Sequence, residues 1–479
     1  MSPTILYDPE AINTIPAVRR SEMRASLPKP PRRRFQPSSS QTLLAAFLSV
    51  SSILLICGAL LVCAEVTLGL VGLGDDEYIK VDPILGISHL ENKWVDFRQE
   101  GFSRTKISSA GLRDIEHQLA KPTGVQRIAF LGDSKTQALQ VSLEDTFVRL
   151  VENNLNAQED HKKFETINFG MSNYGLVQYF VNYLARVRPY SPDVTVVVYH
   201  IFDSRDNVPR FGQQTLPSPT LSLNNRDELA IDYHFLDGWL HTDGAKYMIA
   251  SEWLRRNSHL FQALSADDFM LRTSSKWYTN IFAKLMAPFS GSIENTLAHV
   301  PLSELGSYDS QRKAICDETR ALDKQVSHDD IWMWTVKPRL GKIDAPGIDE
   351  HDSFKLSNDT ARSEVNLAGR VFRMLNLACR NAGSKLVIVT LPAPDNMLFY
   401  VKEIQALKKL AALEGITIID ANAQFPSLSP MEQSPLYYRS HFTPAGHRKL
   451  ANIITRRAQA DSQQIVRRIL FLVIASRTS

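Results

Sequence analysis

The sequence has few cysteines and carries little net charge. Of its 479 residues only four are cysteine, and they form neither a CxxC pair nor any other metal-ligand spacing. Two of them, Cys57 and Cys63, fall inside an apolar run, so at most Cys316 and Cys379 could pair, and buried free thiols are the simpler expectation. No metal site is predicted from this pattern.

Nucleic-acid and nucleotide signatures are also missing. A net charge of +3 is small for this length, and a nucleic-acid interface would need local clustering of basic residues, which occurs only ahead of the apolar run. The chain has no Walker loop and no Rossmann glycine pattern. A charged stretch at Asp349–Asp352 is better interpreted as a solvated loop than as metal ligands. We therefore expect no cofactor and no nucleic-acid partner.

The apolar run itself predicts a membrane span. Residues Leu43 to Ala64 include no charged side chain, and as a helix they would extend roughly 33 Å against a hydrocarbon core of about 30 Å. A cleaved signal peptide has a shorter apolar region, about 7–15 residues, close to the N-terminus, so an uncleaved signal anchor is favoured over it and over a buried core helix. The bilayer is thus the expected partner of residues 43–64.

Charge on either side of the span predicts its orientation. The preceding segment is basic, with Arg32, Arg33 and Arg34 closest to the span, whereas Asp75 and Asp76 follow it. By the positive-inside rule the N-terminus lies in the cytoplasm and the main domain outside, in a periplasm or at the cell surface. Glu65 falls at the outer boundary.

Five short apolar runs, separated by helical patterns, predict a parallel sheet. Helices alternating with strands place helices on both faces of such a sheet, so the fold class is α/β, a three-layer α/β/α arrangement of flavodoxin-like type with about five strands. A mostly helical, aromatic-rich insertion interrupts the pattern between the third and fourth strands. The predicted strands are Ile128–Leu131, Thr166–Gly170, Val194–Tyr199, Leu386–Leu391 and Ile416–Ile419.

A Gly-Asp-Ser turn follows the first predicted strand. Ser134 would stand at the carboxyl edge of the sheet, near the N-terminus of a helix running from about Glu144 to Leu155, and open α/β sheets bind ligands at this edge. Backbone N–H groups at such a position can stabilise an oxyanion. Ser134 is therefore a candidate nucleophile, although serine is also a common turn residue.

The second candidate catalytic segment lies near the C-terminus. His441 precedes a loop and a helix start in which Thr443 is the N-cap and Pro444 the first helical residue. His447 would lie inside that helix and face away. We predict His441 as the general base and His447 as a structural residue.

With these motifs in the right order, the sequence resembles the SGNH, or GDSL-type, hydrolase superfamily, specifically its bacterial membrane-anchored members. The matching blocks are Gly132-Asp-Ser134, Asn168-Phe-Gly170, the His441 segment and a lead-in Gly111-Leu-Arg-Asp114. The resemblance implies that Ser134 is the nucleophile, that His441 is the base, and that the N–H groups of Ser134 and Gly170 form the oxyanion hole.

Two positions depart from the family pattern. Phe202 occupies the place of an oxyanion-donating asparagine, and Tyr438 and Arg439 occupy the places where an aspartate usually orients the histidine. Losing an oxyanion donor costs about 10²–10³ in turnover, and losing the carboxylate about 10⁴. Nearby residues could substitute: Asn173 or Asn207 as the oxyanion donor, and Asp203 or Asp420 as the group that orients His441.

The predicted organisation follows from these segments. It comprises a disordered basic cytoplasmic tail (1–41), a transmembrane signal anchor (42–72), a lead-in segment (78–126), an SGNH-like domain in two parts (127–207 and 365–460), an insertion or lid (208–364) and a C-terminal tail (461–479). Two functions stay open. One is an esterase or O-acyltransferase acting on an acylated small molecule, lipid or polysaccharide, and the other is a catalytically impaired module that binds envelope glycan or scaffolds a complex.

Overall fold

A computed structural model describes most of the chain. The described residues are 39–71, 78–157, 163–200, 203, 218–223, 228–265, 308–328, 358–392, 398–425, 435–438 and 441–457. They fall into two compact units, residues 1–63 and 64–479. The predicted tails, the Asp349–Asp352 stretch, Phe202, Asn207 and Arg439 lie outside the described residues.

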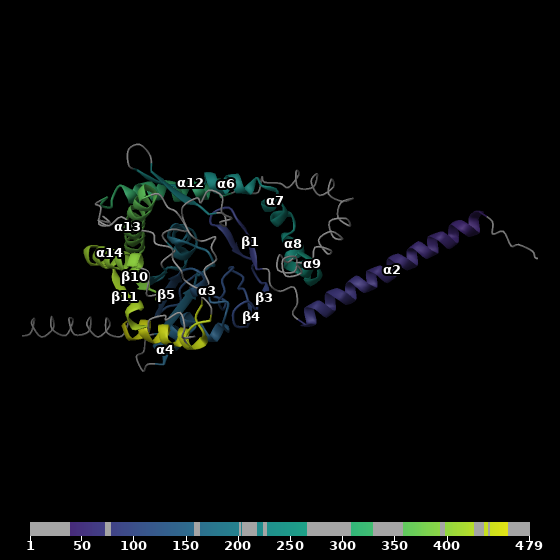
Figure 1. The fold of residues 1–479 in the computed structure, drawn as a ribbon, viewed down its shortest axis with the longest axis horizontal. Coiled ribbons are helices and arrows are strands. Elements are labelled where there is room, and N and C mark those ends of the chain that lie inside the picture. Colours follow the sequence, from purple (N-terminus) through teal and green to yellow (C-terminus); the bar gives the residue numbers. More distant parts are fainter. Residues whose placement is uncertain are drawn as a thin grey trace, which may run out of the picture. The chain divides into compact units, whose positions relative to one another are not determined.

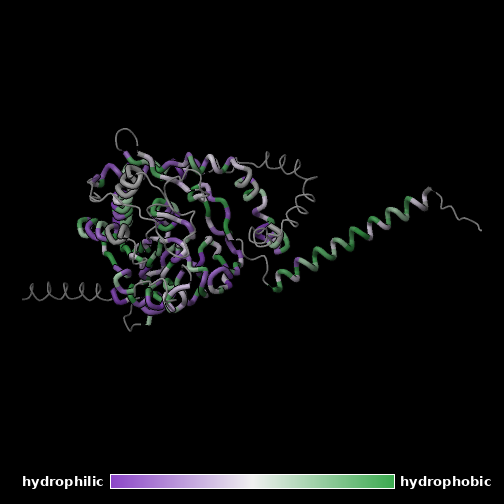
Figure 2. The backbone as a smooth tube through the Cα atoms, in the orientation of Figure 1, coloured by the Kyte–Doolittle hydropathy of each residue, from purple (hydrophilic) through white to green (hydrophobic). Residues whose placement is uncertain are grey.

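The apolar run forms one continuous helix, α2 (Ser39–Val71) (Figure 1). Its stretch Thr42–Val71 is long and apolar enough to cross a membrane, and none of its most apolar window is buried by protein. Figure 2 shows the hydrophobic colour along the length of the helix. The helix extends several residues beyond the uncharged run, so Glu65 lies within it.

The centre of the larger unit is a five-stranded parallel sheet, which confirms the predicted fold class. Its spatial order is β11-β10-β7-β5-β6, and each neighbouring pair is parallel. In chain order this is 2-1-3-4-5, the flavodoxin-like order, whose ligand crevice lies between the first and third strands at their carboxyl ends. The strands are β5 (Val125–Leu131), β6 (Lys163–Asn168), β7 (Val194–Tyr199), β10 (Lys385–Thr390) and β11 (Thr417–Asp420).

Helices cover both faces of this sheet because successive strand residues point to opposite sides. Ile128 and Phe130 of β5 pack in one apolar cluster with α4 (Phe147–Asn156) and the helix at 444–457. Ala129 and Leu131 belong to a second cluster on the other face. That cluster contains residues of α5 (Leu176–Asn182), α13 (Asn358–Asn381) and α14 (Leu398–Glu414).

The lead-in segment forms two antiparallel hairpins. The first pairs β1 (Ile79–Asp82) with β2 (Gly86–His89), and the second pairs β3 (Trp94–Phe97) with β4 (Ser103–Lys106). Side chains of the first hairpin belong to the main hydrophobic cluster, and Val95 and Ile107 pack with Leu139. The segment is thus part of the folded core.

The insertion carries a third hairpin and several helices in its described part. Its elements are β8 (Thr220–Leu223), β9 (Leu229–Asp232), α6 (His234–Leu240), α7 (Asp243–Ala250), α8 (Glu252–Asn257), α9 (His259–Ser265) and α12 (Asp309–Asp323). Buried residues of α6 and α12 belong to the main cluster, so this part of the insertion packs on the domain.

The sequence placed one helix inaccurately. The structure separates a one-turn helix, α3 (Ser134–Gln137), from α4, and Ala138 ends α3 in the left-handed conformation. A 3₁₀ turn (Leu143–Asp145) then precedes α4. The nucleophile candidate thus begins its own short helix.

Candidate active site

Ser134 is the first residue of α3, directly after β5. Asp133 is the N-cap of α3, and its Oδ1 accepts the N–H of Lys135 at 2.9 Å. The carbonyl of Asp133 accepts the N–H groups of Thr136 and Gln137. The first N–H of a helix has no partner within the helix, and in the described part of the chain the N–H of Ser134 has no hydrogen-bond acceptor. It is free to donate to an oxyanion.

The structure brings Ser134 and His441 together. Nε2 of His441 lies 2.9 Å from Oγ of Ser134, within the range expected for a nucleophile and its general base. The N–H of Tyr438 donates to the carbonyl of His441, and Tyr437 forms an isolated antiparallel bridge with Phe442. These contacts hold residues 441–443 ahead of the helix at 444–457.

The other imidazole nitrogen bonds a carboxylate that the sequence did not reveal. Nδ1 of His441 lies 2.8 Å from Oε2 of Glu100, and the two side chains are only 19% and 17% exposed. Glu100 lies in the turn between β3 and β4, in the lead-in segment. Ser134, His441 and Glu100 therefore form the nucleophile, base and carboxylate arrangement of a catalytic triad.

The orienting residues expected from the sequence lie elsewhere. Oδ2 of Asp203 accepts the N–H of His200 at 2.7 Å, and Asp420 accepts the hydroxyl of Thr390 and pairs with Lys408. The expectation that Asp203 or Asp420 orients His441 is therefore corrected, because the carboxylate that bonds His441 is that of Glu100.

Close packing holds the Glu100 turn in position. Gly101 has a φ of +69°, and a Cβ atom added there would lie 2.4 Å from the carbonyl oxygen of Gln140 and 2.7 Å from the ring of Tyr438. The hydroxyl of Ser103 donates to the carbonyl of Leu139 at 2.5 Å. Because Leu139 and Gln140 follow α3, the hairpin is attached to the same loop that carries the nucleophile.

Residues Gly111–Asp114 contact the end of α3 and the loop that follows it. The buried guanidinium of Arg113 donates to the carbonyls of Gln137 and Val141, at the end of α3 and in the loop after it. Oδ2 of Asp114 accepts the N–H of Asn168, the last residue of β6, at 2.8 Å. One short block thus connects the serine turn to the second strand.

Electrostatics favour a neutral His441. Burial lowers the pKa of His441 below its ordinary value of 6.5, the hydrogen bond to Glu100 acts in the opposite direction, and the charge of Lys135 lowers the pKa further. A neutral imidazole is the form that can accept the proton of Ser134. Burial opposes ionisation of Asp133, but the charge of Lys135 helps to keep its pKa below the usual value.

The proposed oxyanion residues differ in their availability. Gly170 packs directly on α3, since an added Cβ would lie 2.5 Å from the N–H nitrogen of Gln137, yet its own N–H donates to Oδ1 of Asn168 at 2.9 Å. Asn173 is exposed and has a φ of +63°. Of the two backbone donors, Ser134 and Gly170, the N–H of Ser134 is the one without an acceptor among the described residues.

His200 follows β7 and lies beside the serine turn. Asp133, His200 and Asp203 are buried, and each offers a ligand atom within 4.8 Å of the others, a spacing that could hold a metal ion. Both carboxylates also accept backbone N–H groups, which gives them a role in shaping the two turns. Burial lowers the pKa of His200 to about 3, and the charge of Lys135 contributes, so the ring is neutral.

His447 has a structural position, as its place in the helix suggested. It is buried, its Nδ1 accepts the N–H of Phe147 at 3.2 Å, and its ring stacks on that of Phe147. The contact joins the start of α4 to the C-terminal helix. His447 therefore stabilises one helical layer and leaves the proton transfer to His441.

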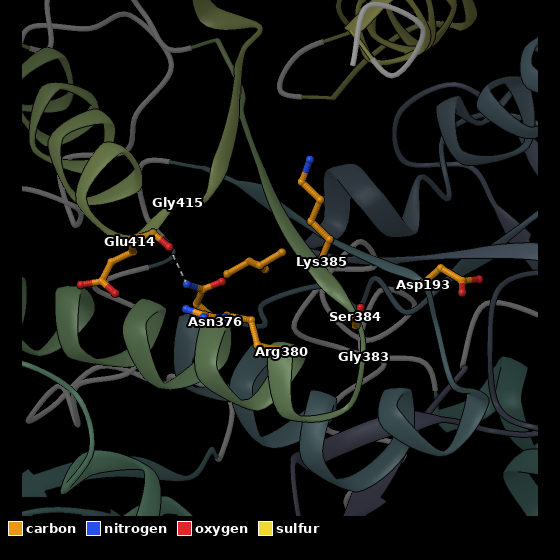
Figure 3. Close-up of a pocket in the computed structure, with 9 residues that line it drawn as sticks. Asp193, Asn376, Arg380, Gly383, Ser384, Lys385, Glu414 and Gly415 are labelled. Carbon is orange, nitrogen blue, oxygen red and sulfur yellow. Dashed lines mark hydrogen bonds between the residues drawn. The ribbon is translucent and has the colours of Figure 1, made fainter. Parts of the chain in front are cut away.

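A separate pocket of about 620 Å³ lies at the opposite edge of the sheet. It is lined where β7, β10 and β11 begin, and Figure 3 shows Arg380, Lys385 and Glu414 among its residues. Nδ2 of Asn376 donates to the carbonyl of Glu414 across one side. The candidate triad is at the carboxyl ends of the strands, so this pocket plays no part in its geometry.

Comparisons with known proteins give only distant likenesses. No family model matches the sequence, and no curated protein matches it. Among solved structures, TesA aligns at 8% identity with a TM-score of 0.30, covering 69% of this chain and 96% of TesA. Axe2, an acetylxylan esterase from Geobacillus stearothermophilus, aligns at 12% identity with a TM-score of 0.30, covering 69% of this chain and 93% of Axe2. With TM-scores this low, the likenesses say nothing about the activity of this chain, which is argued from its own residues.

Proposed function

We propose that this chain is a membrane-anchored serine esterase or O-acyltransferase of SGNH type that acts on ester-linked acyl groups at the outer face of the membrane. The single observation that carries the proposal is the continuous contact from Ser134 through His441 to Glu100, with distances of 2.9 and 2.8 Å. A half-buried serine at the start of a helix has no structural need for an imidazole that is itself oriented by a carboxylate.

The geometry supports a specific sequence of proton transfers. Nε2 of His441 takes the hydroxyl proton of Ser134 as Oγ attacks the acyl carbonyl, and an acyl-enzyme and a free alcohol form when His441 returns the proton to the leaving oxygen. Glu100 stabilises the imidazolium while it carries that proton and holds the ring in the tautomer with hydrogen on Nδ1. The N–H of Ser134 is one donor to the oxyanion, and the N–H of Gly170 becomes the second when Asn168 releases or shares it.

The acceptor of the acyl group decides between two reactions. Water gives an ester hydrolase, and a carbohydrate hydroxyl gives an O-acyltransferase, with identical roles for the triad. A span through residues 43–64 would place the site beside envelope lipids and polysaccharides, which supports substrates of those two kinds.

The rival function is a binding or scaffold module that has lost catalysis. Its main support in the sequence was the absence of an aspartate near His441, and Glu100 supplies a carboxylate at hydrogen-bond distance. What still favours it is the engagement of the Gly170 N–H by Asn168, which removes one of the two backbone donors expected for the oxyanion.

A labelling experiment separates the two functions without knowledge of the acyl donor. The full-length protein in detergent is treated with a small fluorophosphonate probe, which phosphonylates an activated serine with loss of fluoride, alongside the Ser134→Ala and Ser172→Ala variants. Ser172 is the matched control, because it is also half-buried and its hydroxyl donates to the side chain of Gln137. Hydrolysis of a short p-nitrophenyl ester is followed in parallel. The enzyme proposal expects rapid labelling of the wild type and of Ser172→Ala, and none of Ser134→Ala. Equal background labelling of all three proteins would support the binding module.

A further inference from the structure

The outer end of α2 is attached to the insertion by one carboxylate. Glu65 accepts the hydroxyl of Ser258 at 2.8 Å and the N–H groups of His259 and Leu260 at 2.6 and 3.0 Å. The ring of His259 also packs against Gly69, one helical turn further along α2. The start of α9 is therefore fixed to the part of α2 that directly follows the uncharged run.

The neighbouring helix α8 exposes apolar side chains. Trp253 is 70% exposed and Leu254 is 39% exposed. The two arginines that follow have internal partners: Arg255 is buried and donates to the carbonyls of Ile79 and Met248, and Arg256 binds Glu91 and Glu252. The outward face of α8 is consequently apolar and carries no free cation of its own.

Trp253 lies close in the chain to the contact between Ser258 and Glu65, so it is within reach of the membrane interface. Trp253 precedes Ser258 by five residues, and a helix rises about 1.5 Å per residue, so the two lie within roughly 8 Å along the chain. The headgroup layer on each side of the roughly 30 Å hydrocarbon core is roughly 6 Å deep. Tryptophan concentrates in that layer, because its ring is apolar and its indole N–H can be hydrated there.

We propose that α8 lies in the interfacial layer of the bilayer that holds α2, with Trp253 and Leu254 inserted among the lipid headgroups and upper acyl chains. The partner is the membrane interface itself, and the contact continues the one that the span makes. Arg255 and Arg256 bind groups within the protein. The binding of α8 to the membrane therefore depends on apolar contact and does not require anionic lipid. The proposal rests on the membrane anchor of the proposed function and is independent of the ester chemistry.

The consequence is a fixed orientation for the catalytic domain. Arg256 binds both the carbonyl and the carboxylate of Glu91, which lies just before the β3–β4 hairpin that carries Glu100. Two contacts, at Glu65 and at α8, would hold this side of the domain towards the lipid surface. The triad would then meet substrates that lie in, or close to, the membrane plane.

Depth-dependent quenching of a fluorescent label tests whether α8 enters the membrane interface. The full-length protein, with Cys57, Cys63 and Cys316 replaced by serine, is labelled at Leu254→Cys, which keeps Trp253, and is placed in phosphatidylcholine nanodiscs containing lipids with a quencher near the headgroup. The matched control is Leu413→Cys, since Leu413 is 71% exposed on α14. A label at the native Cys57, with the other two thiols replaced, reports on the anchor in matching nanodiscs whose lipids carry the quencher in the acyl chain, because Cys57 lies about 10 Å from the end of the span.

The proposal expects the label at position 254 to be quenched at least about threefold more than the label at 413, equally with and without phosphatidylserine. Quenching at 254 that equals the value at 413, or that requires phosphatidylserine, would overturn it. If Cys57 is quenched in that case, the anchor stands and only the insertion of α8 fails. If Cys57 is not quenched, the anchor fails as well.

Discussion

Glu100 and His441 are 341 positions apart in the chain, yet Oε2 of the first lies 2.8 Å from Nδ1 of the second. The carboxylate comes from the turn of a hairpin that precedes the sheet, and the imidazole comes from the loop before the last described helix. A residue of the lead-in segment can therefore orient the histidine even though no aspartate stands at the usual position shortly before it.

Replacing Gly101 with alanine is expected to move Glu100 away from His441. A Cβ at this position would meet the carbonyl of Gln140 at 2.4 Å, so the turn must shift. We expect turnover to fall about 10²-fold through loss of the oriented carboxylate, with KM changing little, and a loss of about 1–3 kcal/mol in the free energy of unfolding from backbone strain. Steady-state kinetics with a p-nitrophenyl ester and thermal unfolding measure the two effects.

The control for this variant is Gly124→Ala. Gly124 has a φ of +79°, but nothing lies within 4 Å of an added Cβ, so this variant shares the backbone strain without the steric clash. It should lose stability and keep its turnover. Equal losses of turnover in both variants would show that the packing of Gly101 does not position Glu100.

The pH dependence of kcat/KM should report the protonation of His441. Its pKa is depressed below 6.5, chiefly by burial, and the neutral form is the active base. Activity should therefore rise with pH to a plateau, with a midpoint below 6.5. A midpoint above 6.5 in the wild type would contradict this assignment.

Removing the charge of Lys135 should move that midpoint upwards. The Lys135 cation lowers the pKa of His441, so Lys135→Met is expected to shift the acid limb to higher pH. Lys106→Met, an exposed change on β4, should leave the limb unchanged. The profile of kcat/KM against pH for the two variants measures the difference, and a shift to lower pH in Lys135→Met would be inconsistent with the charge effect.

Stability should fall in acid because of His447. Burial lowers its folded-state pKa to about 3, whereas the unfolded value is about 6.5. Between pH 6.5 and about pH 3 the imidazole of His447 is protonated in the unfolded chain and neutral in the folded chain. The free energy of unfolding therefore falls by up to about 1.4 kcal/mol for each pH unit across that range. His447→Gln should weaken the dependence of the melting temperature on pH between 6.5 and 4, although His200 has a similar pKa and retains its own contribution.

Much of the sheet could be predicted from the sequence because its signals are local. Val194–Tyr199 is an unbroken β-branched and apolar run, and it forms β7 with the predicted bounds. The helical pattern before β10 is also local, because Val371, Met374, Leu375 and Ala378 are spaced for one helical face and are buried on α13. The pairing of Ser134 with His441 was anticipated because both follow recognisable turn and helix-start motifs.

Glu100 could not be predicted in the same way. From the sequence, residues 78–126 are interpreted as a lead-in segment, and nothing in them shows which part of the fold the turn at Gly101 will meet. Its partner contacts, with Gln140, Tyr438 and His441, all depend on tertiary packing. For the same reason the engagement of the Gly170 N–H by Asn168 became visible only in three dimensions.

The central claim, that Glu100 completes a catalytic triad, is tested most directly by Glu100→Gln. Turnover of the full-length protein on a p-nitrophenyl ester should drop by about 10²–10⁴. The acid limb should shift to lower pH, because the hydrogen bond and charge of Glu100 raise the pKa of His441, and Glu100→Asp should recover part of the rate. A Glu100→Gln protein with wild-type turnover and an unmoved acid limb would contradict the account.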